Sequence, residues 1–475
     1  MIRPPPTPLL IWTLASAVLL LGSIDLGAWW PSPAPIAPEI RDGAILVVDR
    51  QALAGVDLAL IHKEIVSDWV VAKGGIKELH WEHLHREAGR DPNLGALLDR
   101  MGVLIDADPV LNAEELLGLI QAWNTYLEKA GEPWRLSGEV ALGAEGGTLR
   151  LKSYRVLSED GEVQVGQISF PASVRRRVDN TTQVDAWLGH VHSHEEGVVL
   201  LLDRLSSFAL DRVWPMLDPA LGEVLDPLQQ TFAPAVRAEV ARALTPEQLD
   251  ALVATAEDRM WLIRAAESVH ARHRCGSQFL VSRVPWDGLS PRDLATLQLH
   301  AARGDDEPCP DVTQREALVF ATRSHHLRRQ PGVAGALERL ISWVAQAVAI
   351  HEARHAADVA SGARRGLSCL GCPDEITHVG VLEGSAYLAS FAHPDSAALS
   401  LFQACGLDGS LVPERAAMVS FLAERLVPEG CSGSPDLELA QRARALELEI
   451  FRRSEEIRIV RFPDALPVTP ERDAP

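Results

Sequence analysis

The stretch "ALERLISWVAQAVAIHEARHAADVASG", residues 336–362, is the one that decides how this chain is expected to fold. Its first half is apolar and rich in alanine, which favours a helix buried in a protein interior. Its second half places two histidines, a glutamate and an arginine on the same helix. A buried polar group without a partner costs several kcal/mol, so this helix predicts partners for all four side chains.

A metal ion would be one such partner. His351 and His355 are four residues apart, so both imidazoles lie on one face of a helix and can meet one ion. Glu352 projects about 100° round the helix from His351, beside that ion without being forced to bind it. There it could take a proton from a zinc-bound water, whose pKa the metal lowers to about 7. This is the chemistry of the His-Glu-x-x-His motif of zinc metalloproteases.

A catalytic zinc needs a third protein ligand, and a candidate follows in "THVGVLEGSAYLASFAHP", residues 377–394. Glu383 opens a second helix of small residues there, as Glu-x-x-Ala. Over about residues 338–392 the chain resembles the gluzincin class of zinc metallopeptidases. The resemblance implies a helical, zincin-like domain with Zn²⁺ on His351, His355 and Glu383. It also implies Glu352 as the general base in peptide-bond hydrolysis.

Two positions depart from the gluzincin pattern. Many gluzincins carry an aspartate four residues after the third ligand, which orients a zinc histidine, whereas this chain has Tyr387. Arg354 occupies a position that is usually uncharged, although an arginine there can point outward. Tyr387, His378 and His393 are the nearby candidates for a hydrogen bond to the transition state, and we assign catalytic roles to Tyr387 and His393 with Glu352.

Other ligand sets remain open. Asp358 follows His355 by three residues on the same helical face, although a straight helix carries it away from a metal held by the two histidines. His378 and His393 could each replace Glu383. The clusters "HWEHLH" (80–85) and "HVHSHEEG" (190–197) are interpreted as solvated surface, because neither has a matching base or a closed ligand set.

The rest of the sequence predicts an α+β fold that is predominantly helical. Apolar residues recur every three or four positions before residue 130, alternate between about 134 and 191, and return to helical spacing from "GVVLLLDRLSSFALDRVWPML" (197–217) onward. Ser434 and Pro435 are expected to cap and begin a late helix. The predicted parts are a signal peptide or signal anchor (1–30), a proline-rich spacer (31–42), a helical domain (43–132), a small β-rich unit (133–200), a helical metallopeptidase-like domain (201–460) and a polar tail (461–475).

Charge and cysteines indicate where the protein works. The net charge of -20 argues against a nucleic-acid-binding face, which needs a basic stripe. The apolar run from Leu9 to Leu21 predicts export, with the N-terminal segment anchored in a membrane and the body extracytoplasmic. The six cysteines are expected to pair with their neighbours in sequence, including a tight Cys369–Cys372 loop.

The alternative function is an exported binding or structural protein with a degenerate protease-like domain. The oligomeric state and the peptide or protein substrate are left open.

Overall fold

The computed structural model describes residues 48–467 with gaps, the longest being 273–322. The shorter gaps are 73–76, 108–111, 144–145, 179–187, 192–196, 324–325, 328, 363–365, 408, 410–411 and 454. Contacts divide the chain into two compact units. Unit 1 comprises residues up to 157 together with 175–181, and unit 2 comprises 158–174 and everything from 182 onward. Each unit mixes helices with strands, so the predicted α+β, mostly helical class is confirmed.

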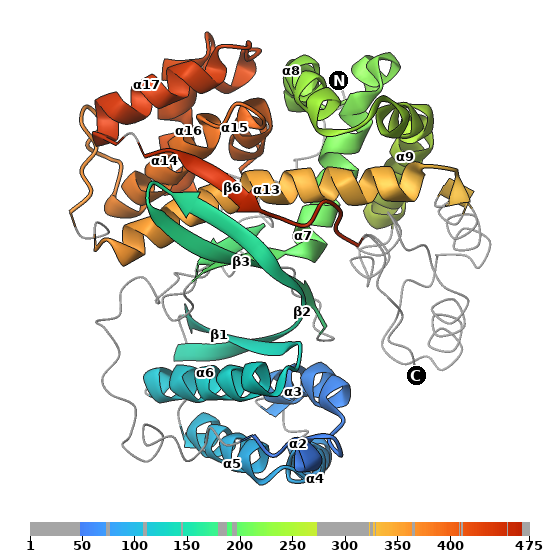
Figure 1. The fold of residues 1–475 in the computed structure, drawn as a ribbon, viewed down its shortest axis with the longest axis vertical. Coiled ribbons are helices and arrows are strands. Elements are labelled where there is room, and N and C mark those ends of the chain that lie inside the picture. Colours follow the sequence, from blue (N-terminus) through green and yellow to red (C-terminus); the bar gives the residue numbers. More distant parts are fainter. Residues whose placement is uncertain are drawn as a thin grey trace, which may run out of the picture. The chain divides into compact units, whose positions relative to one another are not determined.

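Unit 1 is a group of helices packed with a β-hairpin (Figure 1). Its elements are α2 (Arg50–Leu53), α3 (Leu58–Ala72), α4 (Lys77–Ala88), α5 (Pro92–Ala107), α6 (Ala113–Ala130), β1 (Trp134–Gly143) and the first part of β2 (Gly146–Val165). β1 pairs antiparallel with β2, Trp134 opposite Arg155. The core lies between the helices and the hairpin, where leucines, isoleucines and Trp123 are buried. A two-stranded hairpin is marginal by itself, and here the helices cover it.

Unit 2 contains the other strands, which form a curled sheet. These are the second part of β2, β3 (Ile168–Arg177), β4 (Gly189–Val191), β5 (Val198–Leu201) and β6 (Ile457–Arg461). β6 pairs antiparallel with β2, and the order continues from β2 through β3 and β5 to β4. β4 pairs antiparallel with β5. In the described part of the chain β4 therefore ends the sheet on one side and β6 on the other.

The helices of unit 2 enclose one long central helix, α13 (Val333–Ala360). The others are α7 (Leu202–Ser207), η3 (Phe208–Val213), η4 (Trp214–Leu217), η5 (Pro219–Val224), α8 (Pro227–Ala243), α9 (Pro246–Arg272), α14 (His378–Phe391), α15 (Ala397–Cys405), α16 (Pro413–Leu426), η7 (Gly430–Ser432) and α17 (Leu439–Phe451). α13 contacts α14, α9 and strands β4, β5 and β6. Among the described helices, α13 is the one long and apolar enough to cross a membrane, and 72% of its most apolar window is buried inside the protein. It is thus the core helix that its sequence predicts.

The strands between 134 and 201 are divided between units 1 and 2. Three expectations about the elements need correction. Residues 198–201, expected to be helical, form β5, since a short apolar run with two valines fits a buried strand equally well. α17 begins at Leu439 with Glu438 as N-cap, so Ser434 and Pro435 precede the helix. β6 is a further strand within the region expected to be helical.

Two disulfides confirm the predicted neighbour pairing. Cys369 is bonded to Cys372, and Cys405 is bonded to Cys431. Disulfides of this kind form and persist in oxidising compartments, which agrees with an extracytoplasmic body. The third expected pair, Cys275 with Cys309, and the N-terminal segment 1–30 lie outside the described residues.

Candidate metal centre

The packing of α13 against α14 brings three side chains together. The ligand atoms of His351, His355 and Glu383 all lie within 4.8 Å of one another. The two histidine Nε2 atoms are 3.2 Å apart. The Glu383 Oε2 atom stands 3.5 Å from His351 Nε2 and 3.7 Å from His355 Nε2. α14 begins at His378, so Glu383 lies in the middle of a helix that faces the two histidines.

This triangle has the dimensions of a metal site. Ligand atoms around a tetrahedral zinc, with bonds of about 2.0–2.1 Å, stand about 3.3 Å apart. The three observed separations lie within a few tenths of an ångström of that value. Two imidazoles and one carboxylate are also a donor set that zinc accepts at catalytic centres. The three residues could therefore hold a metal ion.

Arg415, near the start of α16, holds the third carboxylate in place. Its Nη2 atom lies 2.9 Å from Glu383 Oε1, so one oxygen of Glu383 meets the guanidinium and the other faces the histidines. Burial would raise the pKa of Glu383, but Arg415 and then the imidazoles hold it well below its usual range. Glu383 is therefore ionised, as a metal ligand must be. Nothing in the sequence around Arg415 points to this contact.

Glu352 is buried beside the triangle. Its side chain is 8% exposed, and burial raises its pKa to about 7, with His351 opposing the shift and Glu383 adding to it. Gly189 of β4 lies against it, because a Cβ at position 189 would stand 3.0 Å from the Glu352 Cγ atom. The absence of a side chain at Gly189 thus lets β4 approach the carboxylate closely, a relation that the sequence does not reveal.

Tyr387 lies one helical turn beyond Glu383 and packs on a histidine of the triangle. Its ring centroid is 4.8 Å from that of His351. The side chain is buried; burial, followed by the nearby Glu383 carboxylate, raises the pKa of its hydroxyl. The hydroxyl is therefore protonated and able to donate a hydrogen bond. The structure brings this predicted residue to the centre.

Arg354 and Asp358 face another part of unit 2. Arg354 does not point outward: it is 1% exposed and pairs with Glu447 of α17 at 2.7 Å and with Glu455 at 3.1 Å. The Asp358 carboxylate pairs with Arg453, so it is engaged away from the histidines. A buried charge must have a partner, and the C-terminal segment supplies the partners that a sequence alone cannot assign.

His393 and His378 are not part of the triangle. His393 lies two residues beyond the end of α14 and lines a cavity with Ile350 and Trp343. It is not among the side chains that the structure groups at the centre. His378 is exposed at the first position of α14.

Comparison with known proteins finds no matching family model, no similar curated protein and no similar solved structure.

Proposed function

We propose that the protein is a zinc-dependent metallopeptidase that hydrolyses peptide bonds. The observation that carries the proposal is the triangle of His351, His355 and Glu383, whose sides match a zinc coordination sphere. The buried Glu352 beside it supplies the base that such chemistry needs.

Each side chain has a role in this proposal. Zinc held by His351, His355 and Glu383 would act as a Lewis acid and lower the pKa of a coordinated water to about 7. Glu352, whose own pKa is about 7, accepts the proton of the attacking water and passes it to the leaving amine. Tyr387, protonated and packed on His351, is placed to donate a hydrogen bond to the oxyanion.

The neighbouring strand β4 favours an extended peptide as the substrate. Within the described residues β4 is hydrogen-bonded to β5 on one side only. An edge strand presents backbone N–H and C=O groups that an extended peptide can pair with. Gly189 brings β4 close to Glu352, so a peptide paired with β4 would lie near the base. The cysteine pairs and the apolar run at 9–21 support an exported body held at a membrane by the N-terminal segment.

The first test measures zinc in the purified protein. We expect one zinc per wild-type chain and loss of the metal in Glu383→Gln. The control is His378→Ala, which changes an exposed histidine of the same helix and should retain the metal. Wild-type protein without zinc, or Glu383→Gln with full zinc, would exclude the proposed site.

The second test separates metal binding from catalysis. Glu352→Gln keeps the shape of the side chain but removes the base, so it should retain zinc and lose about 10²–10⁴-fold in kcat on a quenched-fluorescence peptide. Hydrolysis at the wild-type rate would remove Glu352 from its role. Wild-type protein that binds zinc but cleaves no peptide of a random library would favour the non-catalytic binding protein.

A further inference from the structure

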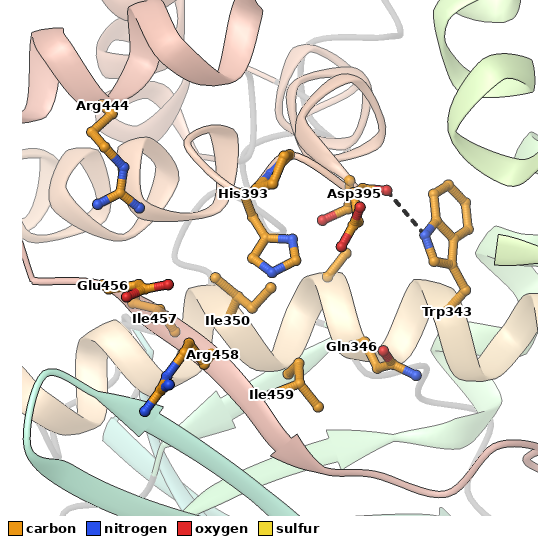
Figure 2. Close-up of a pocket in the computed structure, with 13 residues that line it drawn as sticks. Trp343, Gln346, Ile350, His393, Asp395, Arg444, Glu456, Ile457, Arg458 and Ile459 are labelled. Carbon is orange, nitrogen blue, oxygen red and sulfur yellow. Dashed lines mark hydrogen bonds between the residues drawn. The ribbon is translucent and has the colours of Figure 1, made fainter. Parts of the chain in front are cut away.

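A cavity of about 490 Å³ in unit 2 is lined by the part of α13 that precedes His351. Figure 2 shows it between α13, the segment after α14, and β6. Its floor is apolar and its rim is charged. The floor residues are Trp343, Ala347, Ile350, Ile457 and Ile459, and the rim residues are His393, Asp395, Arg444, Glu456 and Arg458.

This cavity is distinct from the metal centre. The α13 residues that line it precede His351, and their mean direction differs from that of the two histidines by about 110° around the helix axis. Their mean position is also about 10 Å away along the axis. A ligand in this cavity would therefore not touch the metal ligands.

One wall of the cavity is the edge of β6. Four consecutive residues, 456–459, line it. Successive side chains of a strand point to opposite faces, so a consecutive lining run is expected where the edge of the strand borders the cavity. The opposite edge of β6 is paired with β2, and the structure as described shows no strand on the cavity side. An extended backbone can be received there.

The charges of the rim are balanced and separated. Arg444 and Arg458 offset Glu456 and Asp395, while burial lowers the pKa of His393 and leaves it neutral near pH 7. In Figure 2 the His393 ring lies between Arg444 and Asp395 and above Ile350. Within the described chain no ion pair joins Arg444 or the Asp395 carboxylate to another side chain. The cavity thus has the Arg444 guanidinium on one side of its apolar floor and the Asp395 carboxylate on the other.

We propose that this cavity binds a short extended peptide with free termini and apolar side chains. Its carboxylate meets Arg444, its ammonium group meets Asp395, its backbone pairs with the edge of β6, and an apolar side chain rests on Ile350 and Trp343. The volume accommodates about three residues. This binding site does not depend on the proposed peptidase activity.

The experiment is titration calorimetry of Leu-Ala-Leu into the full chain carrying Glu352→Gln, so that the peptide is not cleaved. We expect saturable binding with a Kd below about 1 mM. Arg444→Gln and Asp395→Asn should each weaken it about tenfold, because each removes a charge-assisted hydrogen bond. The control is Arg425→Gln, which removes an exposed arginine paired with Glu449 on α17, and it should leave binding unchanged.

Chelation and blocked termini complete the test. Removal of metal with EDTA should not change binding, and N-acetyl-Leu-Ala-Leu-amide should bind at least about tenfold more weakly. Binding that EDTA abolishes and Arg444→Gln leaves intact would assign the peptide to the metal centre and overturn the proposal. No heat of binding up to 10 times the expected Kd, ~10 mM, would overturn it as well.

Discussion

Unit 1 and unit 2 each carry histidines on helices, fully buried in unit 1 and part-buried in unit 2, and their imidazoles have different partners. His62 of α3 is fully buried; its Nδ1 lies 2.6 Å from Ser153 Oγ, and its Nε2 accepts a hydrogen bond from Trp123 Nε1 at 3.3 Å. His351 and His355 instead turn their Nε2 atoms toward each other and toward a carboxylate. Protein groups occupy both ring nitrogens of His62, whereas the Nε2 atoms of the other two converge on one point. The geometry of the partners, more than burial, distinguishes a structural histidine from a candidate metal ligand.

The largest expected effect is a difference in zinc content between two histidine variants, one from each unit. His351→Ala should remove the zinc and all metal-dependent hydrolysis, because two remaining ligands do not hold a catalytic ion. His62→Ala should retain a full equivalent of zinc. Metal analysis of the two variants after equal dialysis gives the answer, and loss of zinc from both would mean that His351 has no special role.

His62→Ala should affect stability instead. It removes the hydrogen-bond acceptor of Trp123 Nε1 and the contact with Ser153 Oγ and opens a cavity, so we expect a loss of about 3 kcal/mol in the free energy of unfolding of unit 1. Hydrogen exchange of the backbone amides of α6 measures this loss of stability close to the substituted residue. Unchanged protection there would contradict the structural role of His62.

The contribution of His62 to stability should also depend on pH. Burial, followed by the Arg135 charge, lowers the pKa of His62 from 6.5 to about 3. The unfolded chain therefore binds a proton between these values that the folded chain does not, so the stability contribution is present above pH 6.5 and is lost as the pH falls toward 3. In His62→Gln, which does not titrate, this part of the pH dependence of α6 exchange should disappear; an identical profile would rule out His62 as its source.

A substitution of Arg415 tests the metal centre of unit 2. Arg415→Met removes the group that orients Glu383, and zinc affinity should fall about 10–100-fold. Competition with a fluorescent chelator measures this change. Arg425→Met, on the same helix α16, is the matched control and should bind zinc as the wild type does.

The smallest effect is expected at Gly189. An added Cβ would meet the Glu352 Cγ, the Leu200 side chain and the Val199 carbonyl at 3.0–3.1 Å, so Gly189→Ala should shift β4 or the base by a few tenths of an ångström. We expect a several-fold decrease in kcat/KM with zinc content unchanged. An unaltered kcat/KM would show that the approach of β4 to Glu352 is not needed.

Much of the candidate site could be predicted because its information is local. Helical spacing places His351 and His355 on one face, and the small-residue segment around Glu383 predicts a second helix that can pack closely on the first. The pairing of six cysteines is not fixed by their spacing, because 15 patterns are possible, and the two observed disulfides agree with the neighbour pairing that was predicted. β5 was missed because a four-residue apolar run does not distinguish a buried strand from a helix.

By itself, then, the sequence determined the core helix α13 and the paired histidines, since each depends on spacing within one helix. The resemblance to gluzincins indicated Glu383 as the candidate third ligand, and neighbour pairing of the cysteines was one of 15 possible patterns. Only the tertiary structure decided which distant groups complete them: Arg415 on Glu383, β4 against Glu352, and Glu447 on the buried Arg354. It also placed His393 in a separate cavity. The physical reason is that a buried charge or a close backbone approach is satisfied by whatever the fold brings near, and no local pattern encodes that partner.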